Sequence, residues 1–498
     1  MVDELLITGA RVLAADLSDA PLRDVLIRGD RIAALTAPGE IDPATRPHRP
    51  APDRLIVPGL VNGHTHSHGA LAKGLVGDRV ALEVFLASAP AVLAGRTVED
   101  KALSARLSAV ELIRKGCTAC FDLFTEVPVP SVEAIHAVAA AYAETGLRAI
   151  VAPMIATKTL WQALPGLMEA LPPEVRARVQ GLSAAPETAA LDTLRTAFAQ
   201  WPEGIARPGV APTIPLHCSD TFLQNAARLA ADYDAPFQTH LAETEAQATL
   251  AFAQYGKSLT AHLAALGILG PNVSAAHGIW LSDDDLSLLA DHGTGISHNP
   301  MSNLRIGSGV APVRAILEAG VTLGLGTDAT NTSDGQNMFE ATRLGATLSR
   351  VAARDPSAWL SAEEAFTAAT TGSARLLGLE KTGRIEEGWA ADLVFLDLAT
   401  SHYVPFVHPL RQLVFAENGA AVTSVMIAGR LVLDEGRLTT LDEAKLRAEA
   451  EAAAARLNSV NAPGIKAAEA LGDLAGCFCL GLAPNPQGLA RRLNGESR

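Results

Sequence analysis

Cysteine is scarce in this sequence, with five among 498 residues. An odd and low count in so long a chain excludes a disulfide-stapled fold and is typical of a reducing compartment. Cys117 and Cys120 have the spacing of half a zinc site. No second pair lies at a suitable distance, so we interpret both as part of a buried strand, and Cys477 and Cys479 as structural too. Aromatic residues make up only 4% of the chain, so Ala, Leu, Val and Ile must build the core.

Basic residues are also few, 40 Lys and Arg against 54 Asp and Glu, which gives a net charge of −14. A nucleic-acid partner needs a basic surface, so this composition argues against one. No apolar run approaches the roughly 20 residues of a membrane span. The N-terminal residues show no basic segment followed by an apolar block, so no signal peptide is expected. We therefore expect a cytoplasmic protein without a membrane partner.

The two ends of the chain show β patterns. Residues 4–13 and 24–35 alternate apolar and polar side chains around turn signals at Gly9 and Gly29, which predicts a β-meander. The pattern returns in residues 391–398, 411–419 and 422–438. We expect residues 1–57 and 385–440 to pair into one small β-sandwich. We expect residues 441–498 to form a C-terminal helical tail, in which 441–457 is predicted as a helix rich in Ala, Glu and Arg, while the last forty residues contain Pro and Gly and receive no assignment.

Between these ends, short apolar runs alternate with longer amphipathic segments rich in Ala and Leu. Capping patterns such as Ser282 with Asp285 and Ser361 with Glu364 mark helix starts. Strands that alternate with helices predict a parallel sheet, and eight of them fit an α/β fold of the (β/α)8 TIM-like barrel type over residues 58–384. The eight runs are residues 55–63, 117–123, 147–155, 208–214, 236–241, 272–278, 294–299 and 321–328.

Candidate metal ligands fall at the ends of four of these runs. His64 and His66 are two residues apart on one strand, so both imidazoles point to the same side. His240, His277 and Asp328 end or follow the fifth, sixth and eighth runs. The carboxyl ends of barrel strands are where such sites are built. His-x-His alone is a weak signal, but three imidazoles and a carboxylate form a zinc-type ligand set with room for water.

The segments that carry these residues resemble the amidohydrolase superfamily. They are PGLVNGHTHSHGALAKGL, HLAETEAQ, HGIWLSDDDL, SHNPMSNLRIGSG and GTDATNTSDGQNMFEA. They are most similar to the branch of S-adenosylhomocysteine and methylthioadenosine deaminases, guanine deaminases and triazine chlorohydrolases. The resemblance runs from the N-terminal β segment to about residue 440 and is specific for the branch but poor for the substrate.

The resemblance implies a role for each of these residues. His64, His66, His240 and Asp328 would bind one divalent metal, zinc first and iron as the alternative. Glu243 would be the proton shuttle, His277 would hydrogen-bond the attacking hydroxide, and Asp328 would also accept a proton from the water. A bound divalent cation lowers the pKa of water towards about 7, which agrees with this division of roles.

A missing lysine favours a single metal ion. Two-metal relatives usually bridge their ions with a carboxylated lysine on a strand before the His240 position. No lysine occurs between Thr159 and His240.

The residues that meet the substrate are harder to predict. Adenosine-type relatives carry a histidine where this chain has Thr213, with His217 the nearest histidine, which weakens an adenosine-like assignment. The place of a common tryptophan in the loop after the first strand is held by Phe85. The candidate substrate contacts are Phe85, His217, His298, Asn303 and Thr332.

The leading hypothesis is a hydrolytic deaminase of an amino-substituted N-heterocycle (purine, pyrimidine or triazine), an enzyme acting on a small molecule. A chlorohydrolase or cyclic amide hydrolase on the same scaffold is the alternative. A catalytically inactive assembly protein is a third interpretation, which the presence of every expected ligand and of Glu243 disfavours. Family analogy also favours a homodimer or a higher homo-oligomer.

Overall fold

Strands from both ends of the chain form one nine-stranded sheet in the computed structural model, which describes residues 4–184 and 186–492. β5 pairs antiparallel with β17, with Ile56 opposite Phe395. The expected N-terminal meander is present, and Gly29 turns β2 into β3 at a positive φ of 56°. The strands are β1 (Glu4–Val12), β2 (Leu22–Arg28), β3 (Arg31–Thr36), β4 (His48–Pro50), β5 (Arg54–Pro58), β17 (Leu393–Asp397), β18 (Val422–Ile427), β19 (Arg430–Asp434) and β20 (Arg437–Leu438).

All eight apolar runs contain parallel strands. β6, β7, β8 and β10 pair in chain order, as do β12, β13, β14 and β15, while β9 pairs with β11 and β16 with β6. The Gln238 N–H donates to the Val210 carbonyl (3.0 Å) and joins the fourth run to the fifth. The strands are β6 (Leu60–His66), β7 (Cys117–Asp122), β8 (Arg148–Val151), β9 (Met154–Ile155), β10 (Ala206–Pro208), β11 (Ala211–Pro212), β12 (Phe237–Leu241), β13 (Val273–His277), β14 (Gly295–His298), β15 (Leu323–Leu325) and β16 (Asp328–Ala329).

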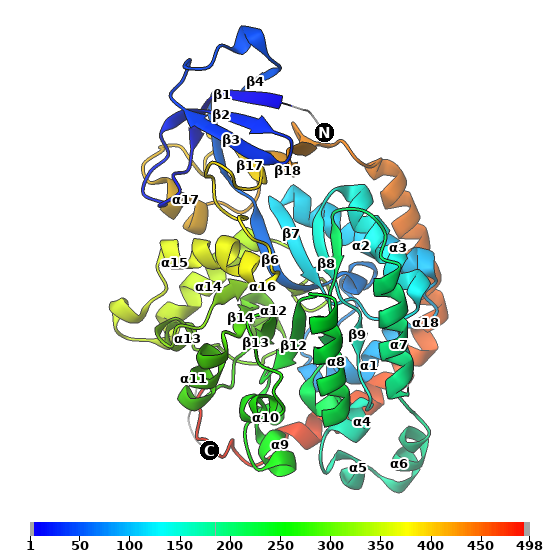
Figure 1. The fold of residues 1–498 in the computed structure, drawn as a ribbon. Coiled ribbons are helices and arrows are strands. Elements are labelled where there is room, and N and C mark those ends of the chain that lie inside the picture. Colours follow the sequence, from blue (N-terminus) through cyan, green and yellow to red (C-terminus); the bar gives the residue numbers. More distant parts are fainter. Residues whose placement is uncertain (1–3, 185, 493–498) are drawn as a thin grey trace.

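Helices follow the parallel strands and lie around them (Figure 1). They are α1 (Leu82–Leu93), α2 (Val98–Arg114), α3 (Val132–Thr145), α4 (Leu160–Ala163), α5 (Leu167–Ala170), α6 (Pro173–Gln180), α7 (Glu187–Ala199), α8 (Asp220–Asp232), α9 (Glu245–Tyr255), α10 (Leu259–Ala265), α11 (Asp283–His292), α12 (Pro300–Arg305), α13 (Val313–Glu318), α14 (Met338–Ala352), α15 (Ala362–Thr367), α16 (Ser373–Leu376), α17 (Pro409–Phe415) and α18 (Glu443–Leu480), with 3₁₀ turns η1 (Pro43–Thr45), η2 (Ser67–Ala72), η3 (Pro215–His217) and η4 (Pro356–Ala358) and the π-helical turn η5 (Ala368–Gly372).

Local sequence explains where these helices begin and which face they bury. Both predicted capping boxes are present, at the starts of α11 and α15. Helix α2 buries Ala105, Ala109, Leu112 and Ile113 completely. Their spacing of four, three and one places them on one face of a helix, so small and aliphatic side chains build the core with few aromatics.

One element departs from the sequence-based expectation. Residues 411–419 were expected to form a strand, but most of this stretch lies in helix α17. Pro409 occupies the first helical turn, where its missing N–H is harmless, and the His408 side chain accepts from the Arg411 N–H. The buried Leu410, Leu413 and Val414 then follow helical spacing. The short apolar run Leu-Val-Phe is compatible with a buried strand and with a short buried helix, so periodicity alone does not distinguish the two.

The C-terminal helix runs along the outer edge of the molecule and packs against α1 (Figure 1). α18 continues past Leu457 to Leu480 with Pro463 inside it. Gly472 and Gly476 approach Val84 of α1 so closely that an added Cβ would lie 3.0 Å and 2.8 Å from its methyl groups. Beyond the helix, Arg491 donates to the backbone carbonyls of the loop that follows β13. The tail therefore holds α1 and that loop in place.

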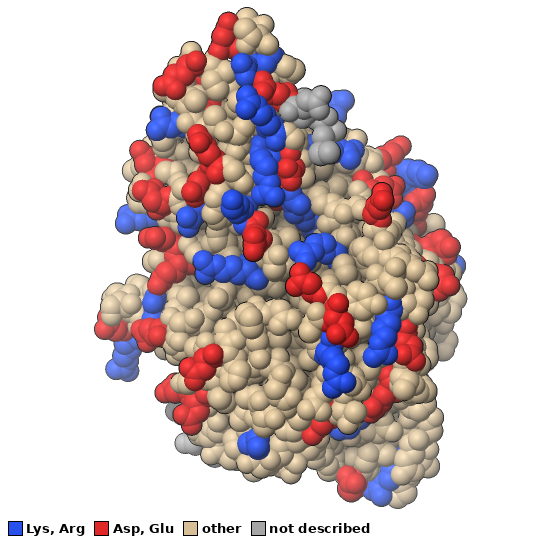
Figure 2. Space-filling model, viewed as in Figure 1, with Lys and Arg blue, Asp and Glu red and all other residues tan. Residues whose placement is uncertain are grey.

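Within the described residues, the structure contains no helix that is both long and apolar enough to cross a membrane. In Figure 2, acidic and basic side chains are interleaved over the upper part and the edges of the visible face, and the lower middle of that face carries few charges.

Candidate active site

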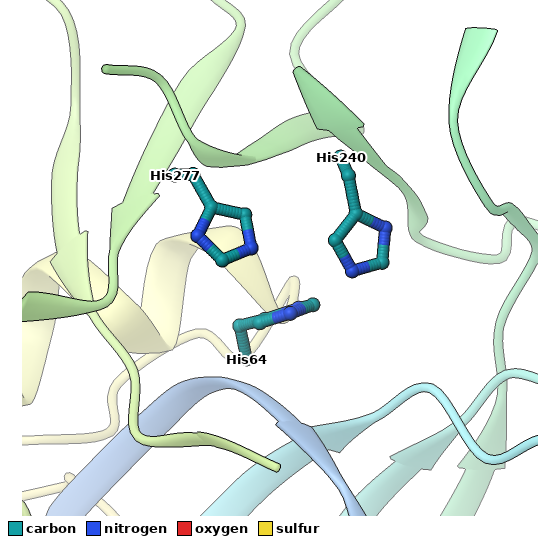
Figure 3. A group of neighbouring side chains, drawn as sticks. All are labelled: His64, His240 and His277. Carbon is teal, nitrogen blue, oxygen red and sulfur yellow. The ribbon is translucent and has the colours of Figure 1, made fainter. Parts of the chain in front are cut away.

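The ends of three strands and the start of a fourth bring five polar side chains together. His64 and His66 end β6, His240 lies on β12, His277 ends β13 and Asp328 begins β16. Each is at most 7% exposed. The rings of His64, His240 and His277 point toward one another from separate strands (Figure 3). Side chains far apart in the sequence therefore share one buried centre.

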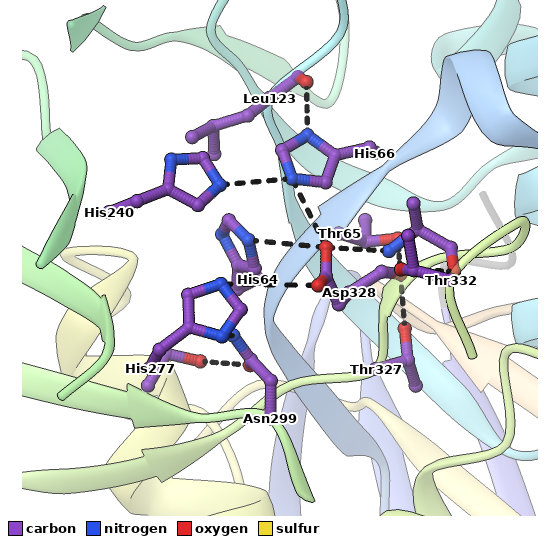
Figure 4. Close-up of polar contacts among 12 residues, drawn as sticks. His64, Thr65, His66, Leu123, His240, His277, Asn299, Thr327, Asp328 and Thr332 are labelled. Carbon is purple, nitrogen blue, oxygen red and sulfur yellow. Dashed lines mark hydrogen bonds and ion pairs between the residues drawn. The ribbon is translucent and has the colours of Figure 1, made fainter. Parts of the chain in front are cut away.

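The donor atoms at this centre lie at metal-ligand separations. His66 Nε2 is 3.2 Å from His240 Nε2 and 3.2 Å from Asp328 Oδ1, and His64 Nε2 is 3.6 Å from the same oxygen (Figure 4). Two nitrogen ligands of a tetrahedral zinc ion, each about 2.05 Å from it, lie about 3.3 Å apart. The observed spacing matches that value.

The far side of each ring fixes which nitrogen faces the centre. His66 Nδ1 lies 2.6 Å from the Leu123 carbonyl and His240 Nδ1 lies 2.6 Å from the Thr213 carbonyl. A carbonyl only accepts, so both Nδ1 atoms carry hydrogen, and in the neutral form that a metal ligand needs both Nε2 atoms present lone pairs. Two lone pairs 3.2 Å apart repel each other unless a cation lies between them.

Gln238 orients the third ring. Its Oε1 lies 2.7 Å from His64 Nδ1, while its Nε2 donates to the Gly63 carbonyl (3.0 Å) and to Ser274 Oγ (2.9 Å). Those two acceptors fix the orientation of the amide, so His64 donates from Nδ1 and turns Nε2 inward. His64 Nε2 and His277 Nε2 have no hydrogen-bond partner among the described residues. Buried and unpartnered acceptors of this kind fit a metal ion and its water.

Backbone conformation also aims side chains at the centre. His277 and Asp328 have φ values of 72° and 61°, in the left-handed region. Such values cost about 1–3 kcal/mol in a residue with a side chain and cluster at functional sites. Both residues stand where a strand meets a loop, and in this conformation each side chain faces the histidine centre.

Burial and neighbouring charges shift the pKa values at this centre in different directions. Burial lowers the pKa of His277 to about 4 and that of His240 well below its usual value, so both of these rings are neutral at pH 7. Burial acts in the same direction on His66, but its contact with Asp328 raises the pKa of that ring above the usual value. Burial, together with the charges of Asp328 and Glu83, raises the pKa of Glu243 well above its usual range. Burial also acts to raise the pKa of Asp328, but hydrogen bonds with His64 and His66 hold it well below normal. One carboxyl is thus suited to hold a proton and the other to be an anion.

Glu243 lies beside the centre rather than within the histidine group. Its Oε1 is 3.6 Å from His277 Nε2, and its side chain is 2% to 3% exposed. A small cavity of about 60 Å³ is lined by Glu243, Asp328, His66 and His240 together with the ring of Phe85 from α1. A reacting group in this cavity would touch Glu243 on one side and the metal ligands on the other.

The sequence that builds this site is similar to proteins of one known family. Residues 55–432 match the model of the Amidohydrolase family. The chain belongs to the amidohydrolase family. A 5-methylthioadenosine/S-adenosylhomocysteine deaminase of Haloarcula marismortui is 32% identical over 460 residues, 92% of this amidohydrolase and 99% of the relative. A 5'-deoxyadenosine deaminase of Methanopyrus kandleri is 32% identical over 407 residues, 81% of this chain and 87% of the relative.

Solved structures resemble this amidohydrolase over most of its length. A zinc-bound adenosine deaminase from Xanthomonas campestris is 29% identical, with a TM-score of 0.80, and the match covers 91% of this chain and 98% of that one. The zinc-bound atrazine chlorohydrolase TrzN from Arthrobacter aurescens TC1 is 26% identical, also with a TM-score of 0.80, over 90% and 100% of the two chains.

The predicted substrate contacts of this amidohydrolase fall into two groups. Phe85 and Thr332 line the small cavity, and His217 lines a larger one beside it. Phe85 lies on helix α1, not in the expected loop. His298 and Asn303 are not among the described residues that line either cavity. Asn303 Oδ1 instead lies 2.8 Å from His277 Nδ1, and its Nδ2 is 3.5 Å from His298 Nδ1, so this pair lies behind His277 and orients it.

Sequence reasoning missed three residues of this amidohydrolase. His68 lines both cavities, and its Nδ1 has no partner in the described part of the chain. It continues the two-residue spacing of the HTHSH segment, which was a readable signal. Gln238, two residues before His240 on the same strand, could have been found in the same way. Glu83 accepts from Thr244 Oγ1 (2.8 Å) next to Glu243, and no local pattern indicates that contact.

Proposed function

We propose that this protein is a hydrolytic deaminase that replaces the amino group of an N-heterocycle with oxygen and releases ammonia. The observation that carries the proposal is the convergence of inward-facing Nε2 lone pairs on Asp328, beside a buried Glu243 with a raised pKa. Relatives named as deaminases, 32% identical over most of the chain, support this reaction class.

We infer that His64, His66, His240 and Asp328 hold a single divalent ion, with zinc expected before iron. Three imidazoles and one carboxylate suit zinc, and the missing lysine before His240 supports one ion rather than two. When bound, such an ion supplies Lewis acidity and lowers the pKa of water at the site. His277 stays outside this ligand set in the proposal and faces the attacking water through Nε2.

The chain's own residues divide the proton transfers. Asp328, whose pKa lies well below normal, accepts a proton from the attacking water as its oxygen bonds to the ring carbon. Glu243 holds a proton in the buried site and delivers it to the adjacent ring nitrogen. His277 Nε2, which is unprotonated, accepts a hydrogen bond from the same oxygen. Asp328 passes the proton that it accepted to the amino group, which leaves as ammonia, and the new hydroxyl returns its proton to Glu243, so the ring carbon keeps the oxygen and both carboxyl groups regain their starting states.

The architecture supports the same assignment. We infer that the parallel strands close into a (β/α)8 barrel over residues 58–384, because β16 pairs back onto β6. Residues 1–57 and 385–440 would then form the small β-sandwich beside it, with 441–498 as a tail. We also propose a cytoplasmic homodimer or higher homo-oligomer, on family analogy.

A screen that reads two leaving groups tests the proposal. The zinc-loaded protein is incubated with adenine, cytosine, guanine, melamine and a chlorotriazine, and ammonia and chloride are measured separately. Ammonia from an amino-heterocycle is the expected product. Chloride alone, or an opened amide ring, would replace the deaminase assignment with the alternative hydrolase. Metal analysis of the same sample should give about one ion per chain.

A further inference from the structure

A second cavity opens beside the small one. It has a volume of about 340 Å³ and lies against α1, α4 and the loops that follow β7 and β9. The two cavities share His68, Phe85, Leu86, Met154 and Thr213 as a common wall. A molecule whose ring lies next to Glu243 can therefore extend a substituent into the larger space. The volume has room for several carbon atoms.

The wall of the larger cavity is mainly hydrocarbon. Its apolar members include Phe85, Leu86, Leu93, Met154, Leu160 and Trp161. They come from α1, β9 and α4, so three separate elements present carbon to the same space.

The wall has few charged groups, and two neutral polar atoms on it, His68 Nδ1 and Thr125 Oγ1, have no partner among the described residues. Glu126 lies 2.8 Å from Lys101 Nζ and accepts from the Ser131 N–H at 2.6 Å, so its charge is already compensated. Burial, with the nearby Lys158 charge, lowers the pKa of His217 to about 4, which leaves it neutral at pH 7. Lys158, half-buried, is the other charged side chain among the described residues of the wall.

We propose that the substrate is an amino-heterocycle that carries an apolar alkyl or aryl substituent, with the ring beside Glu243 and the substituent in the 340 Å³ cavity. This inference rests on the proposed deaminase function. Because most of the wall is hydrocarbon, an apolar substituent gains from burial, whereas each hydroxyl group beyond those that His68 Nδ1 and Thr125 Oγ1 can bind would lose water without a partner. The substrate specificity of the enzyme therefore depends on this substituent, called the arm below, as well as on the ring.

Matched ligands test the arm. Ammonia release is measured for 9-methyladenine, 9-butyladenine, 9-(3-hydroxypropyl)adenine and 9-(2-carboxyethyl)adenine, and for N-methyl- and N-butylmelamine. Three added methylenes correspond to about 60-fold in kcat/KM when all are fully buried. We expect at least about tenfold for butyl over methyl, and a clear loss when the terminal methyl becomes a hydroxyl. A carboxylate arm that outperforms butyl would overturn the proposal and assign the cavity to Lys158 chemistry.

A variant that fills the larger cavity tests whether the arm binds there. Ala89 of α1 lines the larger cavity, and Ala448 is exposed on the helix α18. Ala89→Leu should reduce the ratio of kcat/KM for butyl over methyl about tenfold. Ala448→Leu makes the same change outside the cavity and should leave that ratio unchanged. An unchanged ratio in Ala89→Leu would refute the location.

Binding separates this inference from the proposed function. Titration calorimetry with 9-methylpurine and 9-butylpurine, which have no amino group, measures the arm without turnover. Tighter binding of the butyl compound, without ammonia release from any adenine or melamine, would refute the proposed deaminase function and support the apolar arm site. Ammonia release with equal kcat/KM for the methyl and butyl compounds would refute the arm site and support the deaminase function. If no ammonia is released and the methyl and butyl purines bind equally, both the deaminase function and the arm site are refuted.

Discussion

Replacing Glu243 with glutamine separates proton transfer from metal binding. The amide keeps the length and volume of a side chain that is 2% exposed but cannot deliver a proton. General acid–base catalysis contributes about 10²–10⁴-fold, or about 2.7–5.4 kcal/mol of activation free energy. We expect kcat to fall by that factor in steady-state ammonia assays while elemental analysis gives an unchanged metal content. Normal turnover would remove Glu243 from the mechanism, and loss of the metal would make it a ligand.

The same variant makes a prediction about stability. Burial raises the pKa of Glu243, so in the folded metal-free protein this carboxyl gives up its proton at a higher pH than in the unfolded chain. Its contribution to stability is therefore full below the unfolded pKa and is lost as the pH rises through the folded pKa. Glutamine has no such loss. The Tm of metal-free Glu243→Gln should exceed that of the wild type, and by more at pH 8 than at pH 5; a gap that stays constant would refute the burial argument.

Asp328→Asn is the matched comparison. It removes a charge that His64 and His66 contact, so metal content and kcat should fall together. If this variant keeps its metal, Asp328 is not a ligand.

Other positions give further predictions. Gln238→Leu removes the 2.7 Å contact with His64 Nδ1 and should weaken metal affinity about 10–100-fold in competition with a chelator; an unchanged affinity would show that the strand alone orients the ring. A thiol reagent should label the exposed Cys477 in the native protein within minutes but not Cys117, because burial raises the Cys117 pKa to about 12; labelling of both at one rate would contradict the fold there. Arg491→Ala removes hydrogen bonds to two carbonyls and should lower stability by about 1–3 kcal/mol in denaturant unfolding, and no change would mean that the tail is not a tether.

The strand positions and the five converging side chains could be predicted from the sequence because both depend on local periodicity. His64 and His66 share a face since alternate strand residues do, and each remaining residue lies at or near the end of an apolar run in the sequence. The partners of the rings could not be predicted in this way. His240 Nδ1 meets the carbonyl of Thr213, and His66 Nδ1 that of Leu123, from neighbouring strands. Backbone oxygens carry no sequence signal, so only the assembled sheet reveals them.

The errors have physical causes as well. Residues 411–419 contain a short apolar run that is compatible with a strand or a helix. Pro409 in the first turn and the capping side chain of His408 favour the helix. Within the predicted C-terminal helical tail, a helix was assigned only over residues 441–457, because the Pro and Gly residues that follow left the rest unassigned. Contacts of its later turns with α1, through Gly472 and Gly476, keep it helical to Leu480.

The antiparallel pairing of β5 with β17 has a consequence for synthesis. Residues 54–58 meet residues 393–397, so about 335 residues must be made between the two partners. At about 5–20 residues per second, the ribosome needs roughly 20–70 s to supply the second strand. During that interval the hydrogen-bonding edge of β5, with the apolar Leu55, Ile56 and Val57, has no β17 to cover it. A nascent chain stalled before residue 393 should therefore bind chaperones that recognise extended apolar segments, and release them once β17 emerges.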